Sequence, residues 1–238
     1  MPPSYRSGYS LEGCRERLFR PFPPGTRTPR PHGDRPAAPR IDKEIPPVRM
    51  LLIIGSPRRH SSAGLLAAAC ADTAVSLGGE VRSLDLATAD RRELSRLAVP
   101  ERVAAADAVV LVSPVHHSGY SGLLKTALDE LPETGFAGKA VGLMAHGSGS
   151  RTGNVVCDQL RTVARSLGGW VVPTQIAACP RDFATVRQGR GFPLTAGPPT
   201  TVPDAALTAR LGLFAAELHR CARMLRLTVE AGAEAGSA

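Results

Sequence analysis

Three short segments of the sequence gather the residues that could bind a phosphorylated ligand. The first segment, 55–62, reads Gly-Ser-Pro-Arg-Arg-His-Ser-Ser and follows an apolar run. Its hydroxyls, its guanidinium groups and the free N–H groups of a following helix together favour a phosphate dianion. The segment lacks the lysine of a Walker A loop and the pattern GxGxxG, so it indicates the single phosphate of a mononucleotide. The alternative is a solvated helix cap with incidental serines.

The second and third segments supply glycines and other small residues. Residues 113–122 read Ser-Pro-Val-His-His-Ser-Gly-Tyr-Ser-Gly, a composition that suits close approach of the backbone to a flat ring. Residues 146–154 form a glycine-rich loop that follows one predicted strand and opens a predicted helix. Tyr120 is either a packing residue or a ligand contact. Lys125 and Asp129 are spaced i, i+4 and predict a weak surface pair.

Alternating strands and helices must position these segments. Short apolar runs predict buried strands, and amphipathic stretches predict helices. We expect strands at 50–54, 80–85, 108–113, 140–144 and 170–177, and helices at 61–77, 100–106, 122–131, 153–167 and from 204 onward. Pro173 places the fifth strand at a sheet edge or at a bulge. The alternation predicts an open α/β sheet of parallel strands, with ligands at the carboxyl ends of the strands.

The three segments resemble those of the NADPH-dependent FMN reductase family of flavodoxin-like proteins. The resemblance covers residues 49–180, and its most specific part is carried by Pro114, His116, Gly122, Leu124, Lys125 and Asp129. It implies a flavodoxin-like, doubly wound, five-stranded parallel sheet with helices on both faces. The chain departs from the family at His116, where a tyrosine is usual, and at Ala63, where an asparagine is common. These departures bear on substrate preference and on flavin retention.

The resemblance also implies a set of site residues. The FMN phosphate would be bound by Ser56, Arg58 and Ser61, with Ser62 as a further hydroxyl donor of the same loop. The isoalloxazine ring would be flanked by Pro114, Val115, His116 and His117. The polar edge of the flavin would be reached by Gly147, Ser148 and Gly149.

The implied activity is that of an FMN-dependent NAD(P)H oxidoreductase. NADPH or NADH would deliver a hydride to FMN, and a free flavin, a quinone or an azo compound would accept the electrons. The cofactor does the chemistry, so no side chain is expected to be obligatory for catalysis. His116 and His117 are the candidates for a catalytic acid, because histidine titrates near neutral pH.

Two other functions stay open at this point. One is a flavodoxin-like electron carrier, although such carriers usually dock through acidic surfaces and this chain has a formal net charge of +8. The other is a flavin-free regulatory binding protein on the same fold. We expect no metal site, because His60, His116, His117 and His146 suit the polar contacts of a pocket. Cys70, Cys157 and Cys221 fit small buried hydrophobic positions, and Cys179 is the cysteine to test for reactivity.

Composition excludes several classes of protein. The chain has 238 residues, of which 43% are hydrophobic and 21% charged, and no apolar stretch is long enough to span a bilayer. Aromatic residues make up only 4%, which disfavours a stacking platform for single-stranded nucleic acid. Five cysteines without a CxxC pair favour a reducing compartment, so we expect a cytoplasmic protein. The expected partner is a small-molecule electron acceptor, not a nucleic acid or a membrane.

The ends of the chain differ in composition from its body. Residues 1–48 hold 9 Lys and Arg against 5 Asp and Glu, and 11 of the 21 prolines. This predicts a disordered leader; a start site assigned too early and a targeting or nucleic-acid arm are the alternatives. We expect a chain that starts at Met50 to fold and to bind flavin. The FMN-binding domain is predicted at 49–228 and a disordered tail at 229–238.

The expected assembly is a homo-oligomer, either a dimer or a tetramer, with the active site near a subunit interface. One face of the flavin must stay open for nicotinamide, while hydride transfer benefits from the exclusion of water. The long segment 181–203 is available to reach across such an interface. The alternative is a mobile surface loop on a monomer.

Overall fold

A computed structural model of the chain describes residues 46–87, 95–186 and 200–235. Strands and helices alternate along the chain as the sequence predicts. The elements are β1 (Arg49–Ile54), α1 (Ser62–Ser76), β2 (Glu80–Asp85), η2 (Ser95–Leu97), α3 (Val99–Ala104), β3 (Ala108–Pro114), α4 (Gly122–Leu128), β4 (Ala140–His146), α5 (Ser150–Ser166), β5 (Trp170–Ala178), η3 (Pro180–Asp182), β6 (Phe183–Val186), β7 (Thr200–Pro203) and α6 (Ala205–Ala235).

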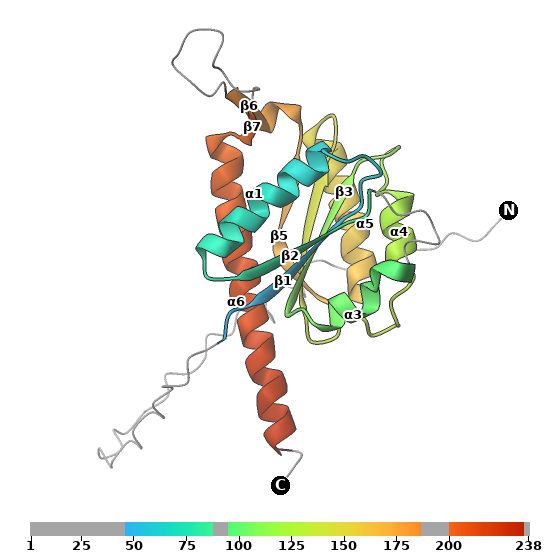
Figure 1. The fold of residues 1–238 in the computed structure, drawn as a ribbon, viewed down its shortest axis with the longest axis vertical. Helices are drawn as coiled ribbons and strands as arrows, with labels where there is room; N and C mark the ends of the chain where they lie inside the picture. The colour runs from blue at the N-terminus through green and yellow to red at the C-terminus, as the bar shows by residue number, and fades with distance from the viewer. Residues whose placement is uncertain (1–45, 88–94, 187–199, 236–238) are drawn as a thin grey trace, which may run out of the picture. The chain divides into compact units, whose positions relative to one another are not determined.

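Five strands form one parallel sheet in the order β2-β1-β3-β4-β5. Helices α1 and α6 cover one face of this sheet, and α3, α4 and α5 cover the other (Figure 1). The flavodoxin-like doubly wound sheet is therefore confirmed. The chain reverses its direction of winding between β1 and β3, and ligands of such sheets bind outside the carboxyl ends of the strands at this point. The prediction for Pro173 is also confirmed: β5 is an edge strand, and its register against β4 shifts between Val141 and Leu143.

Two apolar layers hold the helices on the sheet. Leu52 and Met144 face α1 and α6, where Phe214 fills the space between helix and sheet. On the other face Leu111 and Leu143 belong to a second buried cluster. Strands β1, β3 and β4 are thus buried on both faces, which explains why their sequences are continuous apolar runs and do not alternate with polar residues.

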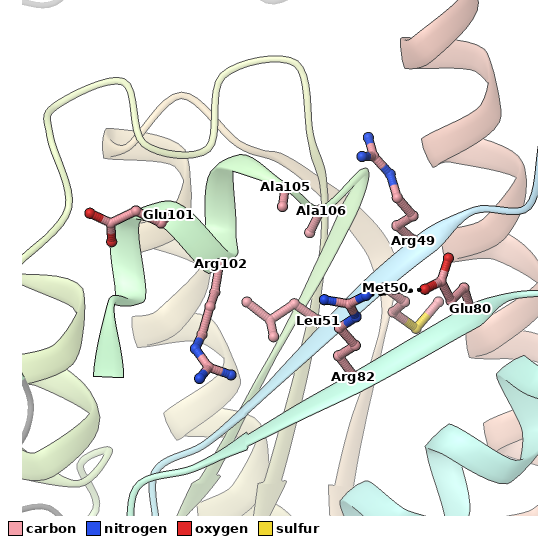
Figure 2. A pocket seen from close by; sticks show the side chains of 9 residues that line it. All are labelled: Arg49, Met50, Leu51, Glu80, Arg82, Glu101, Arg102, Ala105 and Ala106. Carbon is pink, nitrogen blue, oxygen red and sulfur yellow. Dashed lines mark hydrogen bonds and ion pairs between the residues drawn. The ribbon is translucent and has the colours of Figure 1, made fainter. Parts of the chain in front are cut away.

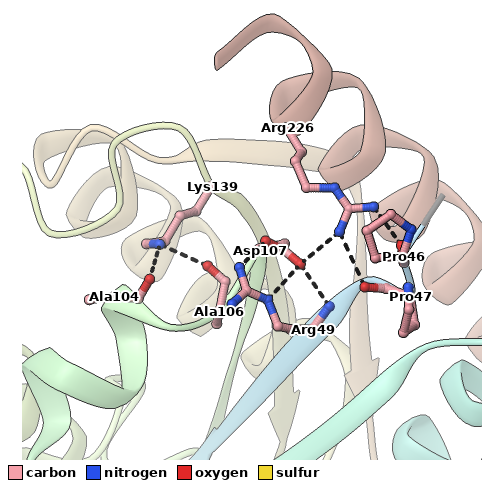
Figure 3. A network of polar contacts seen from close by, with 8 residues as sticks. All are labelled: Pro46, Pro47, Arg49, Ala104, Ala106, Asp107, Lys139 and Arg226. Atoms are coloured by element: carbon pink, nitrogen blue, oxygen red, sulfur yellow. Dashed lines mark hydrogen bonds and ion pairs between the residues drawn. The ribbon is translucent and has the colours of Figure 1, made fainter. Parts of the chain in front are cut away.

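A polar network ties the amino edge of the sheet to Arg226 in the second half of α6 (Figure 3). Asp107 accepts hydrogen bonds from the Arg49 side chain at 2.7 and 3.2 Å and from the Arg49 backbone N–H at 2.9 Å. Arg226 of α6 lies 3.4 Å from the same carboxylate and donates to the carbonyls of Pro46 and Pro47 at 2.6 and 3.2 Å. Burial opposes ionisation of Asp107, but the hydrogen bonds and charge of Arg49, with the charge of Arg226, leave its pKa lowered.

The contacts of residues 46–49 bear on where the folded body begins. Val48 is only 1% exposed, and Pro46, Pro47 and Arg49 all belong to the polar network. A chain that began at Met50 would lose these contacts. The rest of the expected leader, residues 1–45, lies outside the described residues.

Two features at the other end of the chain differ from the predictions. Helix α6 continues to Ala235, so helix replaces the expected disordered tail from residue 229 as far as that residue. The reason is local composition, because alanine and glutamate, both strong helix formers, dominate 230–235. In addition, β6 and β7 pair as an antiparallel ribbon within the segment 181–203, where no strand was predicted. Residues 187–199 between them lie outside the described residues.

None of the helices in the described ranges combines the length and the apolar composition needed to cross a bilayer.

Candidate functional site

The three segments singled out in the sequence meet at the carboxyl edge of the sheet around one pocket of about 220 Å³. The predicted residues that line it are Ser56, Arg58, Ser61, Ser62, Pro114, Val115, His116, Gly147 and Ser148. Of the four histidines expected to make the polar contacts of a pocket, His116 and His146 line it and His60 does not. Ala63 and Pro180, which had not been assigned to the ligand, also line it. The predicted residues His117 and Gly149 do not line it.

The first loop ends at the N-terminus of α1. Ser61 is the N-cap of this helix, and its Oγ accepts a hydrogen bond from the N–H of Gly64 at 3.1 Å. Ser56 is buried, and its hydroxyl bonds to the backbone of Arg58 at 3.3 Å, which closes a turn before the helix. The first N–H groups of a helix have no intrahelical partner, and they open onto this pocket through Ser62 and Ala63.

Ser121 ties the first loop to the second. Its hydroxyl donates to the carbonyl of Gly55 and accepts from the N–H of Leu124 at 3.1 Å, so that it caps α4. A Cβ on Gly55 would lie 2.5 Å from the Cβ of Leu124. Only glycine therefore lets the first loop approach α4 this closely, and the two loops are fixed against each other.

The second loop is a tight hairpin. His116 and Gly119 exchange two backbone hydrogen bonds of 2.9 Å, and His117 and Ser118 occupy the turn with φ of 49° and 61°. Gln159 of α5 donates to the carbonyl of Ser118 at 3.0 Å and so supports the turn. His117 consequently sits at the tip, while His116 lines the pocket. Next to the hairpin, Tyr120 packs against the buried cluster under α4, which favours the packing role for its ring.

The third loop begins where β4 ends. Gly147 is buried, and its N–H donates to the carbonyl of Ala178 at 3.0 Å. A Cβ at this position would meet Oγ1 of Thr152 and Cγ2 of Val115, both at 2.8 Å. Glycine is therefore required for the third loop to lie directly against the second.

His146 stands at the junction of the pocket and a neighbouring cavity of about 170 Å³. Its ring centroid lies 5.7 Å from that of Phe183 in β6, with the rings tilted by 56°. Burial lowers the pKa of His146, although the nearby Asp182 carboxylate opposes this shift. The imidazole is thus held neutral at neutral pH. The summed volume of the two cavities falls within the range of roughly 300–1,000 Å³ that is usual for ligand sites.

A larger cavity, of about 450 Å³, lies at the opposite edge of the sheet between α3 and strands β1 and β2. Figure 2 shows Arg82 turned toward Glu80, and the two side chains are 3.4 Å apart. Arg49 is paired with Asp107, and Arg102 donates to the carbonyl of Leu97 at 2.8 Å. Because its guanidinium groups are already engaged, this cavity is a weaker candidate for an anionic ligand than the pocket at the carboxyl edge.

The structure agrees with the expectation for Cys70 and Cys157 but not for the other two cysteines, because Cys179 is buried and Cys221 is only partly buried. Cys70 and Cys157 are buried, and burial raises the pKa of each thiol to about 12. Cys221 is partly buried, and its pKa is raised by burial and by the charge of Glu217. Cys179 is buried at the end of β5, next to the pocket residue Pro180. Within the described residues no group of three or more histidine, cysteine, aspartate or glutamate side chains could hold a metal ion.

Sequence comparison relates this chain to flavin-dependent reductases. The profile of the NADPH-dependent FMN reductase family matches residues 48–183. FMN-dependent NADPH-azoreductases from several strains of Staphylococcus aureus are 44% identical to this chain over 89 residues, which are 37% of this chain and 47% of those proteins. The chain thus spans about half the length of these curated relatives.

Solved structures agree on the fold. An oxidoreductase from Corynebacterium diphtheriae is 22% identical with a TM-score of 0.56, over 74% of this chain and 97% of that one. An NADH:FMN oxidoreductase in its apo form is 24% identical with a TM-score of 0.54, over 76% and 89%. A WrbA-like flavodoxin protein from Agrobacterium tumefaciens is 15% identical with a TM-score of 0.50, over 74% and 98%. At these identities the likeness shows the shared fold.

Proposed function

The chain belongs to the NADPH-dependent FMN reductase family, whose profile covers more than half of its residues, and we propose that it is an FMN-dependent NAD(P)H oxidoreductase. The observation that carries this proposal is the meeting of three loops around one pocket at the carboxyl edge of the sheet. One loop offers hydroxyls, a guanidinium group and a helix N-terminus. The other two offer a tight hairpin and a glycine-rich turn.

We assign the phosphate of FMN to the first loop. Ser56, Ser61 and Ser62 surround the N-terminus of α1, where free N–H groups and the helix dipole favour an anion. Arg58 is exposed at the rim and has no ion-pair partner within the described residues. Its guanidinium group can therefore form charge-assisted hydrogen bonds to a phosphate dianion.

We assign the isoalloxazine ring to the second and third loops. Pro114, Val115 and His116 would lie along the ring, with His117 at the hairpin tip beside them. The N–H of Gly147 is already used in a bond to Ala178. A donor to the polar edge of the ring would therefore come from Ser148, which lines the pocket, while Gly149, the N-cap of α5, stands next to it outside the lining.

FMN supplies the redox chemistry of such a site, namely acceptance of hydride from NADPH or NADH and delivery of electrons to an acceptor. The residues of the chain bind and orient the reactants. His116 is exposed at the rim of the pocket and is the candidate to give a proton to the reduced acceptor, with His117 as the alternative. The acceptor is a free flavin, a quinone or an azo compound, and the names of the Staphylococcus aureus relatives support the azo compound.

The proposal extends to location and assembly. The free cysteines Cys70, Cys157, Cys179 and Cys221 and the use of NADPH support a reducing, cytoplasmic setting. A homo-oligomer, as a dimer or a tetramer, would wall the open side of the pocket. Phe183 and Thr201 of the β6–β7 ribbon line the cavity next to the site in their own chain.

Steady-state kinetics of the purified full chain test the proposed function. We expect added FMN to bind, and NADPH or NADH to be consumed when a quinone or an azo dye is supplied. A protein that binds FMN but oxidises neither nucleotide would be an electron carrier. A protein that binds no FMN would be a flavin-free member of the fold. Flavin released by heat should be FMN, and FAD as the main species would contradict the assignment of the phosphate loop.

A further inference from the structure

The cavity of about 170 Å³ next to the candidate site has no charged side chain in its lining. The residues that line it are Ser62, Leu65, His146, Pro180, Phe183 and Thr201. Three of them also line the pocket assigned to FMN, so the cavity adjoins that pocket directly. The other three, Leu65, Phe183 and Thr201, line the cavity alone. A substitution at these three positions therefore changes the cavity and leaves the lining of the pocket intact.

The β6–β7 ribbon supplies one wall of this cavity and is anchored to the body of the fold. Phe183 packs against the buried cluster beneath α1 and α6. Asp182 accepts a hydrogen bond from the N–H of Cys179 at 2.7 Å, and Asp204 accepts one from the N–H of Leu207 at 2.7 Å. The backbone N–H of Asp204 in turn donates to the carbonyl of Asp182 at 2.9 Å. The two carboxylates at the base of the ribbon are thus engaged by backbone N–H groups, and neither of them lines the cavity.

The shape and the apolar part of the lining suit a flat ring. An apolar cavity of about 150 Å³ can hold a benzene molecule, so this cavity of about 170 Å³ has room for one six-membered ring. The rings of His146 and Phe183 lie 5.7 Å apart and are tilted by 56°, while Leu65 and Pro180 add aliphatic contacts. Aromatic side chains favour offset or edge-to-face contact with a further ring.

The polar part of the lining consists of two hydroxyls and one imidazole. Ser62 and Thr201 each carry a hydroxyl that can donate a hydrogen bond to a carbonyl oxygen. Burial lowers the pKa of His146, so its imidazole adds no positive charge at neutral pH. Because no cation lines the cavity, an anionic group would lose its hydration there without gaining an ion-pair partner. The lining therefore favours a neutral ligand with a carbonyl group.

We propose that this cavity is a subsite for a neutral six-membered ring that carries a carbonyl group. The dihydronicotinamide of NADPH or NADH, with its carboxamide, and the ring of a quinone both have this chemistry. The subsite rests on the proposed function, because these are the rings that exchange electrons with FMN. It selects against an acceptor whose ring bears an anionic group, such as a sulfonated azo dye. Leu65, Phe183 and Thr201 determine this selection.

Ligand-observed NMR on the full chain, in the presence of saturating FMN, tests the subsite. Benzamide is the probe, because it is a neutral ring with a carbonyl group and is not an electron acceptor for a reduced flavin. Benzoate is its anionic match. We expect benzamide to bind more tightly than benzoate by about tenfold or more. Equal binding of the two probes, or no detectable binding of benzamide, would overturn the proposal.

Two variants locate the bound ring. Leu65→Trp places an indole at the cavity and should weaken benzamide binding by about tenfold or more. Thr201→Val removes one hydroxyl and should weaken it by about two- to tenfold. Val75→Trp is the matched control, because Val75 is an exposed residue of the same helix as Leu65 and does not line the cavity. Unchanged benzamide binding in both cavity variants, or an equal loss in Val75→Trp, would overturn the assignment.

The affinity for FMN is a second measurement on the same variants. None of the three substituted residues lines the pocket assigned to FMN, so the dissociation constant of FMN should stay at its wild-type value. A loss of FMN binding that accompanies the loss of benzamide binding would contradict a subsite separate from that pocket.

Steady-state kinetics of Leu65→Trp identify the reactant that uses the subsite. A higher KM for NADPH or NADH assigns the nicotinamide ring, and a higher KM for tetramethyl-1,4-benzoquinone assigns the ring of the acceptor. Unchanged KM values for all of them would overturn the role of the cavity in the reaction. A chain that binds benzamide in this cavity but oxidises neither nucleotide would contradict the proposed function and keep the binding site, so the two failures are distinguishable.

Discussion

The two edges of the central sheet use polar residues in opposite ways. At the amino edge, Asp107 is paired with Arg49 and Arg226, and Lys139 donates to the carbonyls of Ala104 and Ala106 at 3.1 and 2.7 Å (Figure 3). Burial lowers the pKa of Lys139, against the opposing charge of Asp107. These groups satisfy one another, and their contribution is to stability.

At the carboxyl edge the loops are fixed in place, and polar side chains at the rim of the pocket stay exposed. Gly55, Ser121 and Gly147 lock three loops together, while Arg58 and His116 stay exposed at the rim. A site that binds a ligand needs donors that are positioned and not already paired. The comparison therefore predicts that variants of the amino edge change stability, whereas variants of the carboxyl edge change ligand binding.

The largest expected effect comes from shortening the amino edge. A chain that begins at Met50 loses the buried Val48 and the pairing of Arg49 with Asp107, so its free energy of unfolding should fall by about 3–5 kcal/mol. A chain that begins at Pro46 keeps these contacts and is the matched control. Urea denaturation of both proteins measures the difference. Equal stability of the two chains would show that residues 46–49 do not contribute to the free energy of unfolding.

Removal of the central carboxylate should have the next largest effect. Asp107→Ala leaves two guanidinium groups without their shared partner, and we expect a loss of about 2–3 kcal/mol of unfolding free energy. Glu80→Ala breaks an exposed pair with Arg82 and should cost no more than about 0.5 kcal/mol. The affinity of the folded Asp107→Ala protein for FMN should not change. A loss of FMN binding in this variant would contradict the division between the two edges.

At the carboxyl edge, Arg58→Ala should weaken FMN binding with little effect on stability. The lost charge-assisted contact is worth about 1.5–3 kcal/mol, so the dissociation constant should rise by about 10- to 100-fold. Arg59 is the neighbouring exposed arginine and does not line the pocket, so Arg59→Ala should change the constant by no more than about twofold. Fluorescence titration with FMN distinguishes the two variants. Equal effects of the two substitutions would mean that Arg58 has no specific role.

The third loop allows a test of close packing. Gly147→Ala would place a Cβ 2.8 Å from both Thr152 and Val115, and we expect a cost of about 1–2 kcal/mol in unfolding free energy. Gly149→Ala is the control, because its backbone is extended and a Cβ there meets no atom within 4 Å. Thermal unfolding of both variants checks this. Equal stability of Gly147→Ala and Gly149→Ala would contradict the close contact between the second and third loops.

The smallest expected effect is a dependence on pH. The pKa of Asp107 is lowered in the folded state, so its contribution to stability is present above its unfolded value of about 3.9 and is lost as the pH falls through the folded value. The Asp107→Asn variant has no carboxylate at this position, so it lacks this contribution at every pH. The difference in unfolding free energy between the wild type and Asp107→Asn should therefore shrink as the pH is lowered from about 5 to 2. A constant difference over this range would contradict the lowered pKa.

Much of the fold could be predicted because its signals are local. A continuous apolar run such as 50–54 identifies a strand buried on both faces, and Ser61 identifies the helix that follows it. The β6–β7 ribbon has no such signal, since each strand has only four residues in a segment rich in proline and glycine. The amino-edge network escaped prediction for a different reason. Asp107 and its two arginines are 58 and 119 positions apart in the sequence, and only the folded sheet brings them together.

The candidate site could likewise be predicted only where its residues carry a local signal. Hydroxyls, an arginine and glycines in loops that follow strands were enough to identify Ser56, Arg58 and Gly147. Pro180 gave no chemical signal, although it follows the fifth strand and so had to lie at the same edge of the sheet. The exposed apolar side chains of α6, such as Leu213 and Met224, were also missed, because the apolar positions that face the sheet account for the helix on their own.

The most direct test of the proposed function is an anaerobic titration of the FMN-loaded full chain with NADPH, followed by its visible absorption spectrum. Without oxygen no other acceptor can reoxidise the flavin. We predict that the absorption of oxidised flavin disappears with one equivalent of NADPH or NADH per bound FMN, and returns when a quinone or an azo dye is added. A spectrum that keeps its oxidised-flavin absorption in excess NADPH and in excess NADH would contradict the assignment of this chain as an FMN-dependent NAD(P)H oxidoreductase.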